Sequence, residues 1–266
     1  MLPEIYILGQ RIALYALMIV LGITAGILTA LVLNKEKLII NEDIIFAYLF
    51  GAIGAVAGGK ILYLITEMPR IITNFKYFLN NPEYFQLLLS GGFVFYGSLI
   101  GGLLMVYLYC RKYNVSIPAL SMLMIPTIPL IHSFGRIGCF FAGCCYGIEY
   151  DGIASITFNN SPVAPNGVPL FPVQLLESFI NLIIFIILIY YRRRARSHKN
   201  LIALYLILYS VARFVLELLR GDTVRGFIFG LSTSQWISLL IIVIIAVYYI
   251  KSNLIGHSIR KNTKHI

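Results

Sequence analysis

Two sets of polar residues recur at helical spacing inside otherwise apolar segments. One set steps by four, four and three residues and consists of Tyr209, Arg213, Glu217 and Arg220. The other steps by three and four and consists of Gln174, Glu177 and Asn181. These spacings place each set on one face of a helix. Ionisable groups in an apolar span are costly unless they are paired or face a wet cavity, so both sets mark a candidate site.

Arg136, in a third apolar segment, adds another cation to this candidate site. Counted with Arg213 and Arg220, it leaves more positive than negative charge, which predicts a bound anion. Guanidinium groups suit phosphate because their paired N–H donors match its oxygens. The alternative is an ion-pair network between helices that only fixes their packing.

Three cysteines, Cys139, Cys144 and Cys145, follow Arg136 closely. They allow three interpretations: a metal site, a redox or acyl-carrying thiol pair activated by the arginines, or small apolar side chains packed between helices. The C-x4-C-C spacing lacks the C-x2-C pairs of structural zinc sites, so we predict no metal. The sequence contains no nucleotide-binding fingerprint either, and we expect no soluble cofactor.

Composition places these segments in a membrane. Of the 266 residues, 59% are hydrophobic and 12% are charged, whereas soluble proteins average about 25% charged residues. A soluble fold of this size cannot cover so much apolar surface, so most of it must face lipid or pack between helices. The net charge of +10 does not indicate nucleic-acid binding, because no basic face or aromatic platform remains outside the apolar segments.

Seven apolar segments are long enough to cross a bilayer, which needs roughly 20 residues per helix. They are residues 11–34, 43–66, 85–110, 118–147, 171–191, 201–220 and 231–250. The fourth is long and contains Pro118, Pro126 and Pro129, so we expect it to be kinked or to begin in the membrane interface. The sequence therefore predicts an all-α integral membrane protein with a single polytopic domain over residues 1–266.

The basic residues of alternate loops predict the orientation. On one side of the predicted membrane lie Lys35, Lys37, Arg111, Lys112 and the basic residues of segments 192–199 and 251–264. Cytoplasmic loops are rich in Lys and Arg, so we expect the N-terminus outside and the C-terminus in the cytoplasm. In this orientation the polar residues of the candidate site lie in the outward half of the bilayer. They are Tyr15, Tyr96, Arg136, Gln174, Glu177, Arg213, Glu217 and Arg220.

Four segments resemble the bacterial prolipoprotein diacylglyceryl transferase family. They are Tyr96–Gly102 (YGSLIGG), His132–Phe140 (HSFGRIGCF) with Tyr146 and Gly147, Pro172–Glu177 (PVQLLE), and Ala212–Glu217 (ARFVLE) with Arg220 and Asp222. Tyr15 falls where the family has a tyrosine in its first helix. The matching segments keep the family's order along nearly the whole chain.

The resemblance implies transfer of a diacylglyceryl group from phosphatidylglycerol to the thiol of a lipobox cysteine in a prolipoprotein, with release of glycerol phosphate. It implies a multi-pass protein of the bacterial cytoplasmic membrane, in contact with membrane lipid. The expected catalytic residues are Arg136 and Arg213, which would hold the phosphate, with Tyr96 and Glu217. The residues expected to bind substrate are Tyr15, Gly97, Cys139, Cys144, Gly147, Gln174, Glu177, Tyr209 and Arg220.

Several positions depart from the family pattern. Tyr96 replaces a histidine, Cys139 an asparagine and Cys144 an acidic residue. The base that accepts the thiol proton is therefore open: it is Tyr96, or His132 one turn before Arg136. Two other functions remain open. One is a paralogue that moves lipid from the same cavity to another acceptor or through its own cysteines; the other is a non-catalytic lipid-binding or flipping protein.

Overall fold

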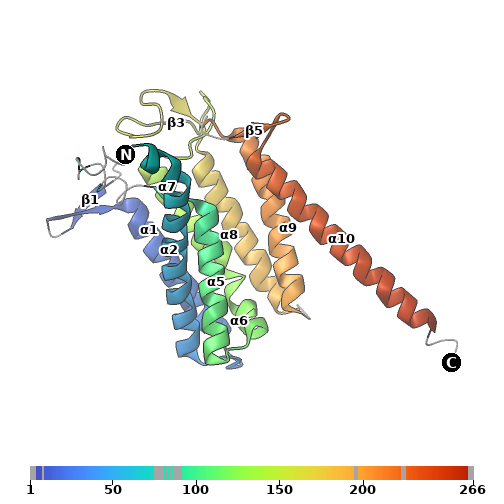
Figure 1. Cartoon of the computed structure of the whole chain (residues 1–266). Coiled ribbons are helices and arrows are strands. Elements are labelled where there is room, and N and C mark those ends of the chain that lie inside the picture. The colour runs from blue at the N-terminus through green and yellow to red at the C-terminus, as the bar shows by residue number, and fades with distance from the viewer. Residues whose placement is uncertain are drawn as a thin grey trace. The chain divides into compact units, whose positions relative to one another are not determined.

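The computed structural model describes residues 4–7, 9–74, 81, 83, 86, 92–194, 197–222 and 226–262. These residues are mostly helical, as predicted, with three small two-stranded antiparallel sheets (Figure 1). The helices are α1 (Leu14–Leu33), α2 (Asn41–Thr73), α5 (Phe95–Tyr113), α6 (Ile117–Met124), α7 (Thr127–Ala142), α8 (Val173–Arg192), α9 (His198–Leu216) and α10 (Thr233–Asn262), with a 3-10 turn η1 (Glu217–Leu219). The chain divides into two compact units, residues 1–29 with 121–266, and residues 30–120.

The unit of residues 30–120 is built on α2 and α5, whose backbones approach closely at glycines. A Cβ added to Gly58 would lie 2.9 Å from the Cα of Gly101 and would collide with the carbonyl oxygen of Gly97. Near the first turn of α2, the Tyr109 hydroxyl donates a 2.6 Å hydrogen bond to Asp43 and joins the two helices again. Small residues at a helix interface increase packing contact where no hydrophobic effect drives association.

In the other unit, α7 packs on α8, α8 on α9 and α9 on α10. The hydroxyls of Ser133 and Ser178 share a 2.9 Å hydrogen bond between α7 and α8. Ile184, Leu188 and Leu201 form a buried apolar cluster between α8 and α9. This stack of helices carries most of the polar residues that the sequence singled out.

Within the described part of the chain, five helices are long and apolar enough to cross a membrane: α1, α2, α8, α9 with its continuation to Leu219, and α10. A sixth span results if α6 and α7 count as one, because they are bent by 42° at a short break. The break contains Pro126, so the predicted kink is confirmed. The predicted span 85–110 is not among these helices: α5 begins at Phe95, and residues 87–91 lie outside the described part of the chain.

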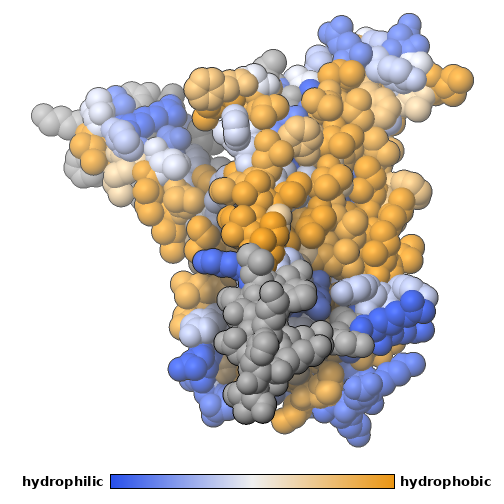
Figure 2. All heavy atoms as spheres, turned by 90° about the vertical axis from the view of Figure 1, so that its right-hand side faces the viewer, coloured by the Kyte–Doolittle hydropathy of each residue, from blue (hydrophilic) through white to orange (hydrophobic). Residues whose placement is uncertain are grey.

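The spanning helices present apolar side chains outward. Only 17% of the candidate span of α10 is buried. Figure 2 shows hydrophobic side chains over much of the helical surface on the face that it displays. An apolar surface of this kind needs lipid around it, because its contact with water would be unfavourable. The described residues thus form a multi-pass membrane protein.

Two features of the structure were not predicted from the sequence. The first helix begins at Leu14 rather than at residue 11, because strand β2 (Gln10–Ala13) pairs with β1 (Glu4–Ile7). The loop 148–170 contains strands β3 (Ile156–Thr157) and β4 (Pro169–Leu170) and a small buried cluster of Phe158, Ala164 and Leu170. Arg196 and Lys264, two of the basic residues that predicted the orientation, lie outside the described residues.

The close approach of α2 and α5 gives the first prediction. Gly58→Val should lower the free energy of unfolding by about 1–3 kcal/mol, because the added side chain has no room between the helices. Thermal unfolding of the detergent-purified protein measures this. Ala57→Val places the same side chain at an exposed position of α2 and is expected to have little effect. Equal effects of the two variants would contradict the packing role of Gly58.

Candidate functional site

The most buried charges of the larger unit meet between α7, α8 and α9. Glu177, on the second turn of α8, is 2% exposed. Its Oε1 atom lies 3.0 Å from Nε of Arg136 on α7 and 3.8 Å from Nη1 of Arg213 on α9. One carboxylate therefore links cations from two neighbouring helices. The two sets of polar residues that helical spacing predicted, on α8 and α9, do lie side by side.

Arg213 has a second carboxylate partner one helical turn further on. Its Nη2 atom lies 2.7 Å from Oε2 of Glu217 and donates a 3.3 Å hydrogen bond to the hydroxyl of Ser234 on α10. Ser234 was not predicted as a site residue. Arg213 is thus held from α8, η1 and α10 together.

The third arginine closes the end of the cluster. Arg220 donates from Nε to Asp222 Oδ1 at 2.9 Å and pairs with the other carboxylate oxygen through Nη2. Its backbone forms an antiparallel bridge with Gly147, where a Cβ would collide with the carbonyl oxygen of Phe171. Gly147, which was expected to bind substrate, thus allows the loop after α7 to lie against the segment after η1.

These pairs correct the charge count made from the sequence. Arg136, Arg213 and Arg220 face the three carboxylates of Glu177, Glu217 and Asp222. The predicted excess of positive charge is therefore wrong, because Asp222 had not been counted and neutralises Arg220. Any affinity for an anion has to come from unused N–H donors rather than from net charge.

Unused donors and acceptors are present at this depth. Nη1 of Arg213 is buried and has no hydrogen-bond acceptor among the described residues. The side-chain oxygens of Gln174, Asn181 and Ser210 are likewise buried without a hydrogen-bond partner in the described part of the chain. Each buried donor or acceptor that lacks a hydrogen bond costs about 1–3 kcal/mol of stability. These atoms can therefore form hydrogen bonds with a polar group that is not part of the protein.

Two aromatic groups and one histidine border the arginines. His132 Nε2 accepts a 3.1 Å hydrogen bond from Nε of Arg136, and the His132 ring packs 5.5 Å from that of Tyr209. Tyr15 on α1 packs against α7, where a Cβ added to Gly138 would lie 3.1 Å from its ring. His132 thus lies on α7, the helix that carries Arg136, and Tyr15 and Tyr209 pack against this helix.

The predicted residues Cys139 and Cys144 lie at the end of α7, beside this cluster. Gln174 Nε2 donates a 2.9 Å hydrogen bond to the backbone carbonyl of Cys144, which ties α8 to that turn. Hydrogen bonds from the thiols of Cys139 and Cys144 hold the pKa of the Cys145 thiol well below its usual range. Burial disfavours the charge of Arg220, but its hydrogen bonds with Asp222 outweigh this and raise its pKa.

Tyr96 and Gly97 belong to the unit of residues 30–120 and are described by that unit alone. Tyr96 is in the first turn of α5 and is exposed, with its ring 5.7 Å from that of Phe95. Gly97 faces α2 at Gly58, so its role in the structure is close helix packing. The catalytic role of Tyr96 and the substrate-binding role of Gly97 stay predictions.

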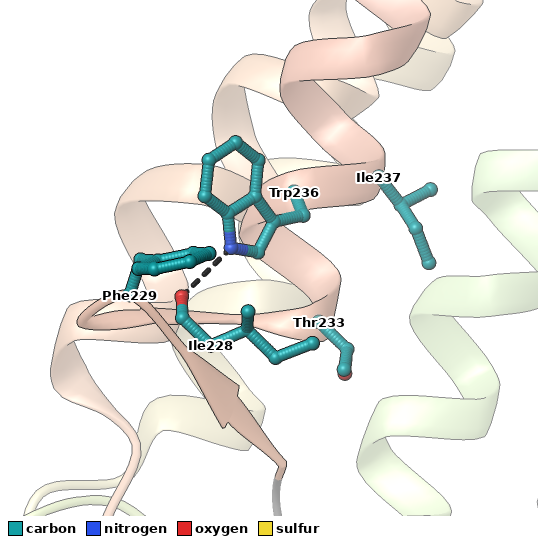
Figure 3. A pocket seen from close by; sticks show the side chains of 5 residues that line it. All are labelled: Ile228, Phe229, Thr233, Trp236 and Ile237. Atoms are coloured by element: carbon teal, nitrogen blue, oxygen red, sulfur yellow. Dashed lines mark hydrogen bonds between the residues drawn. The ribbon is translucent and has the colours of Figure 1, made fainter.

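An apolar surface pocket of about 400 Å³ lies elsewhere, between α10 and the hairpin of β5 (Phe227–Ile228) and β6 (Leu231–Ser232). Its lining residues are Ile228, Phe229, Thr233, Trp236 and Ile237 (Figure 3). The Trp236 indole donates a 2.9 Å hydrogen bond to the carbonyl of Ile228 and braces the hairpin against the helix. The pocket lining carries no charged group and so offers no cation to an anionic ligand.

Fold and site together define a multi-pass membrane protein with a buried arginine–carboxylate cluster near one end of its helices. The model of the prolipoprotein diacylglyceryl transferase family matches residues 3–251. A phosphatidylglycerol–prolipoprotein diacylglyceryl transferase of Clostridium tetani is 42% identical over 237 residues, 89% of this chain and 91% of the relative. A second such enzyme, from Clostridium perfringens, is 37% identical over 89% of this chain and 90% of its own. The chain belongs to the prolipoprotein diacylglyceryl transferase family.

The Arg136–Glu177 contact gives a stability prediction. Arg136→Ala should lower the free energy of unfolding by about 3–5 kcal/mol, because it leaves the buried Glu177 carboxylate without one of its cations. The double variant Arg136→Ala/Glu177→Ala should cost less than the sum of the single changes, by about 0.5–3 kcal/mol.

Thermal unfolding of the four proteins in one detergent gives this coupling. The control is the pair of the exposed Arg70 and the half-buried Glu67 on α2, separated by 3.6 Å. Its removal should change stability by less than about 1 kcal/mol. Additive effects of the Arg136 and Glu177 substitutions would show that the two side chains do not interact as the structure has them.

Proposed function

We propose that this protein transfers the diacylglyceryl group of phosphatidylglycerol to the thiol of a lipobox cysteine in a prolipoprotein, and releases glycerol phosphate. The observation that carries the proposal is the buried arginine cluster with an unused donor at Arg213 Nη1. Membership of the family supports the same reaction, since the relatives compared above carry its name.

The reaction needs cations at the leaving group. The thiolate of the acceptor attacks the glyceryl carbon that bears the phosphate, the carbon–oxygen bond breaks, and the phosphate oxygen keeps the electron pair. Arg213 would donate to this phosphate from Nη1, while Nη2 stays with Glu217. Arg136 contacts His132 and Glu177 through Nε alone in the described residues, so its two Nη groups would also face the phosphate. Donors fixed before the reaction stabilise developing charge without reorganisation.

The carboxylates hold these arginines in position. Because each guanidinium carries five N–H donors, one side chain can keep its carboxylate partner and still bind a phosphate oxygen. Glu177 and Glu217 would therefore act by orienting Arg136 and Arg213. Tyr15, Tyr209, Gln174 and Arg220 would shape the cavity around the lipid head group.

The test is direct transfer in vitro. Purified protein with phosphatidylglycerol and a lipobox peptide should yield a peptide heavier by one diacylglyceryl group in the mass spectrum. Arg136→Ala and Arg213→Ala should each lower the rate by about 100-fold or more, as loss of a transition-state donor does elsewhere. Arg70→Ala, a change at an exposed arginine of α2, should leave the rate unchanged. Absence of product from folded protein that still binds the lipid would contradict the proposal and favour a paralogue with another acceptor.

The same assay distinguishes the two candidate bases. If Tyr96 accepts the thiol proton, Tyr96→Phe should lower the rate strongly and His132→Gln only weakly. The pH–rate profile of His132→Gln should then keep its shape. A stronger loss in His132→Gln than in Tyr96→Phe would assign the proton transfer to the histidine beside Arg136.

The arginine cluster would face the outside of the bacterial cytoplasmic membrane. This orientation rests on the basic loops and places the site where secreted precursors emerge. A reporter that fluoresces only in the cytoplasm should be active when it is fused after Ile266 and silent when it is inserted in the loop 148–170. The reverse pattern would overturn the orientation.

A further inference from the structure

The turn after α7 gathers three of the four cysteines of the chain. The sulfur atoms of Cys139, Cys144 and Cys145 all lie within 4.8 Å of one another. Cys139 is 9% exposed, and the other two are half-buried. None of the three is needed as a nucleophile or as a phosphate ligand in the proposed transfer. The fourth, Cys110, is buried on α5 in the other unit.

Two left-handed residues make this gathering possible. Gly143 ends α7 with φ of 66°, and its amide together with that of Cys144 caps the helix at the carbonyls of Phe140 and Cys139. Cys145 follows at φ of 54°, a conformation that residues with a Cβ rarely adopt. The chain thus folds back over the last turn of α7. The turn thus brings the three thiols together, which the C-x4-C-C spacing alone did not predict.

The geometry of the three sulfurs fits one metal ion. Zinc lies about 2.3 Å from each thiolate sulfur, so three sulfurs around one ion are about 4 Å apart. Small rotations of the three side chains reach this spacing from the observed one. A disulfide would join only two of the sulfurs and leave the third aside. Thiolate ligands select soft cations such as zinc or copper(I) over calcium and magnesium.

The surroundings favour thiolates at this turn. Arg136 and Arg220 both interact electrostatically with Cys145. Three thiolates and one divalent ion carry a net charge of −1, so the zinc ion itself neutralises most of the thiolate charge. Glu177 and Asp222 are already engaged with the same arginines, so they do not repel the cluster unpaired.

We propose that Cys139, Cys144 and Cys145 bind one zinc ion through their three thiolates, with release of their thiol protons. The ion would fix the turn after α7, to which Gln174 is hydrogen-bonded through the Cys144 carbonyl. It would thereby hold the loop that lies against Arg220 at Gly147. A metal that binds only the folded chain would stabilise it by RT ln(1 + c/Kd), where c is the free metal concentration, so the stability rises with the logarithm of the metal concentration.

Cobalt(II) titration of the reduced, detergent-purified full chain tests the site. Cobalt bound to thiolates gives sulfur-to-metal charge-transfer absorption, and the expected stoichiometry is one ion per chain, displaced by zinc. Cys139→Ser, Cys144→Ser and Cys145→Ser should each lower the affinity at least tenfold. Cys110→Ser is the matched control and should bind as the unaltered chain does. Equal binding by all four variants, or no charge-transfer band at all, would overturn the proposal.

A second measurement does not depend on variants that fold. The unaltered chain is treated with iodoacetamide with and without zinc, and the modified cysteines are identified by mass spectrometry. Zinc should protect Cys144 and Cys145 from alkylation, and removal of zinc with a chelator should restore their reaction. Equal alkylation in both conditions, or a disulfide among the three cysteines that persists in the presence of reductant and zinc, would contradict a metal site. Both readouts are independent of the transferase activity.

Discussion

The packing of the larger unit depends on the contacts of the Glu177 carboxylate with Arg136 and Arg213. The carboxylate is buried between three helices and lies within 4 Å of guanidinium nitrogens from α7 and α9. A buried carboxylate is tolerated only with such partners, and each arginine in turn needs the carboxylate. The packing of α7, α8 and α9 and the placement of Arg136 and Arg213 are therefore one physical constraint. A change that loosens the helices also loosens the site.

Under the proposed function, the same constraint accounts for how a charge-balanced cluster would bind an anionic lipid. The three arginines are matched by three carboxylates, so there is no net positive charge to attract a phosphate. What remains is geometry: Nη1 of Arg213 is buried and without an acceptor in the described part of the chain. A buried donor that carboxylates already hold in place stabilises a bound phosphate more than a mobile surface arginine does.

Helical periodicity was sufficient to predict part of this arrangement. The steps of three and four residues around Glu177 and Arg213 required one face on each helix, and the structure joins those faces. The partner of Arg220 was not predicted, because Asp222 follows the helix in a segment without periodic spacing. The meeting of Cys139 with Cys144 and Cys145 depends on left-handed backbone at Gly143 and Cys145, which apolar patterning does not reveal. The span expected over 85–110 lies partly outside the described residues, and its described part, α5, begins at Phe95 and is not among the candidate spans.

In the proposed function, the Arg136–Glu177–Arg213 cluster holds the phosphate of a phospholipid. An experimental structure of the protein in bilayer discs that contain phosphatidylglycerol tests this most directly. The account predicts a phosphate oxygen within about 3 Å of Arg213 Nη1, a normal hydrogen-bond distance, with the Glu177 and Glu217 contacts kept. A lipid phosphate bound elsewhere, with Arg213 Nη1 hydrogen-bonded to protein or water, would contradict it.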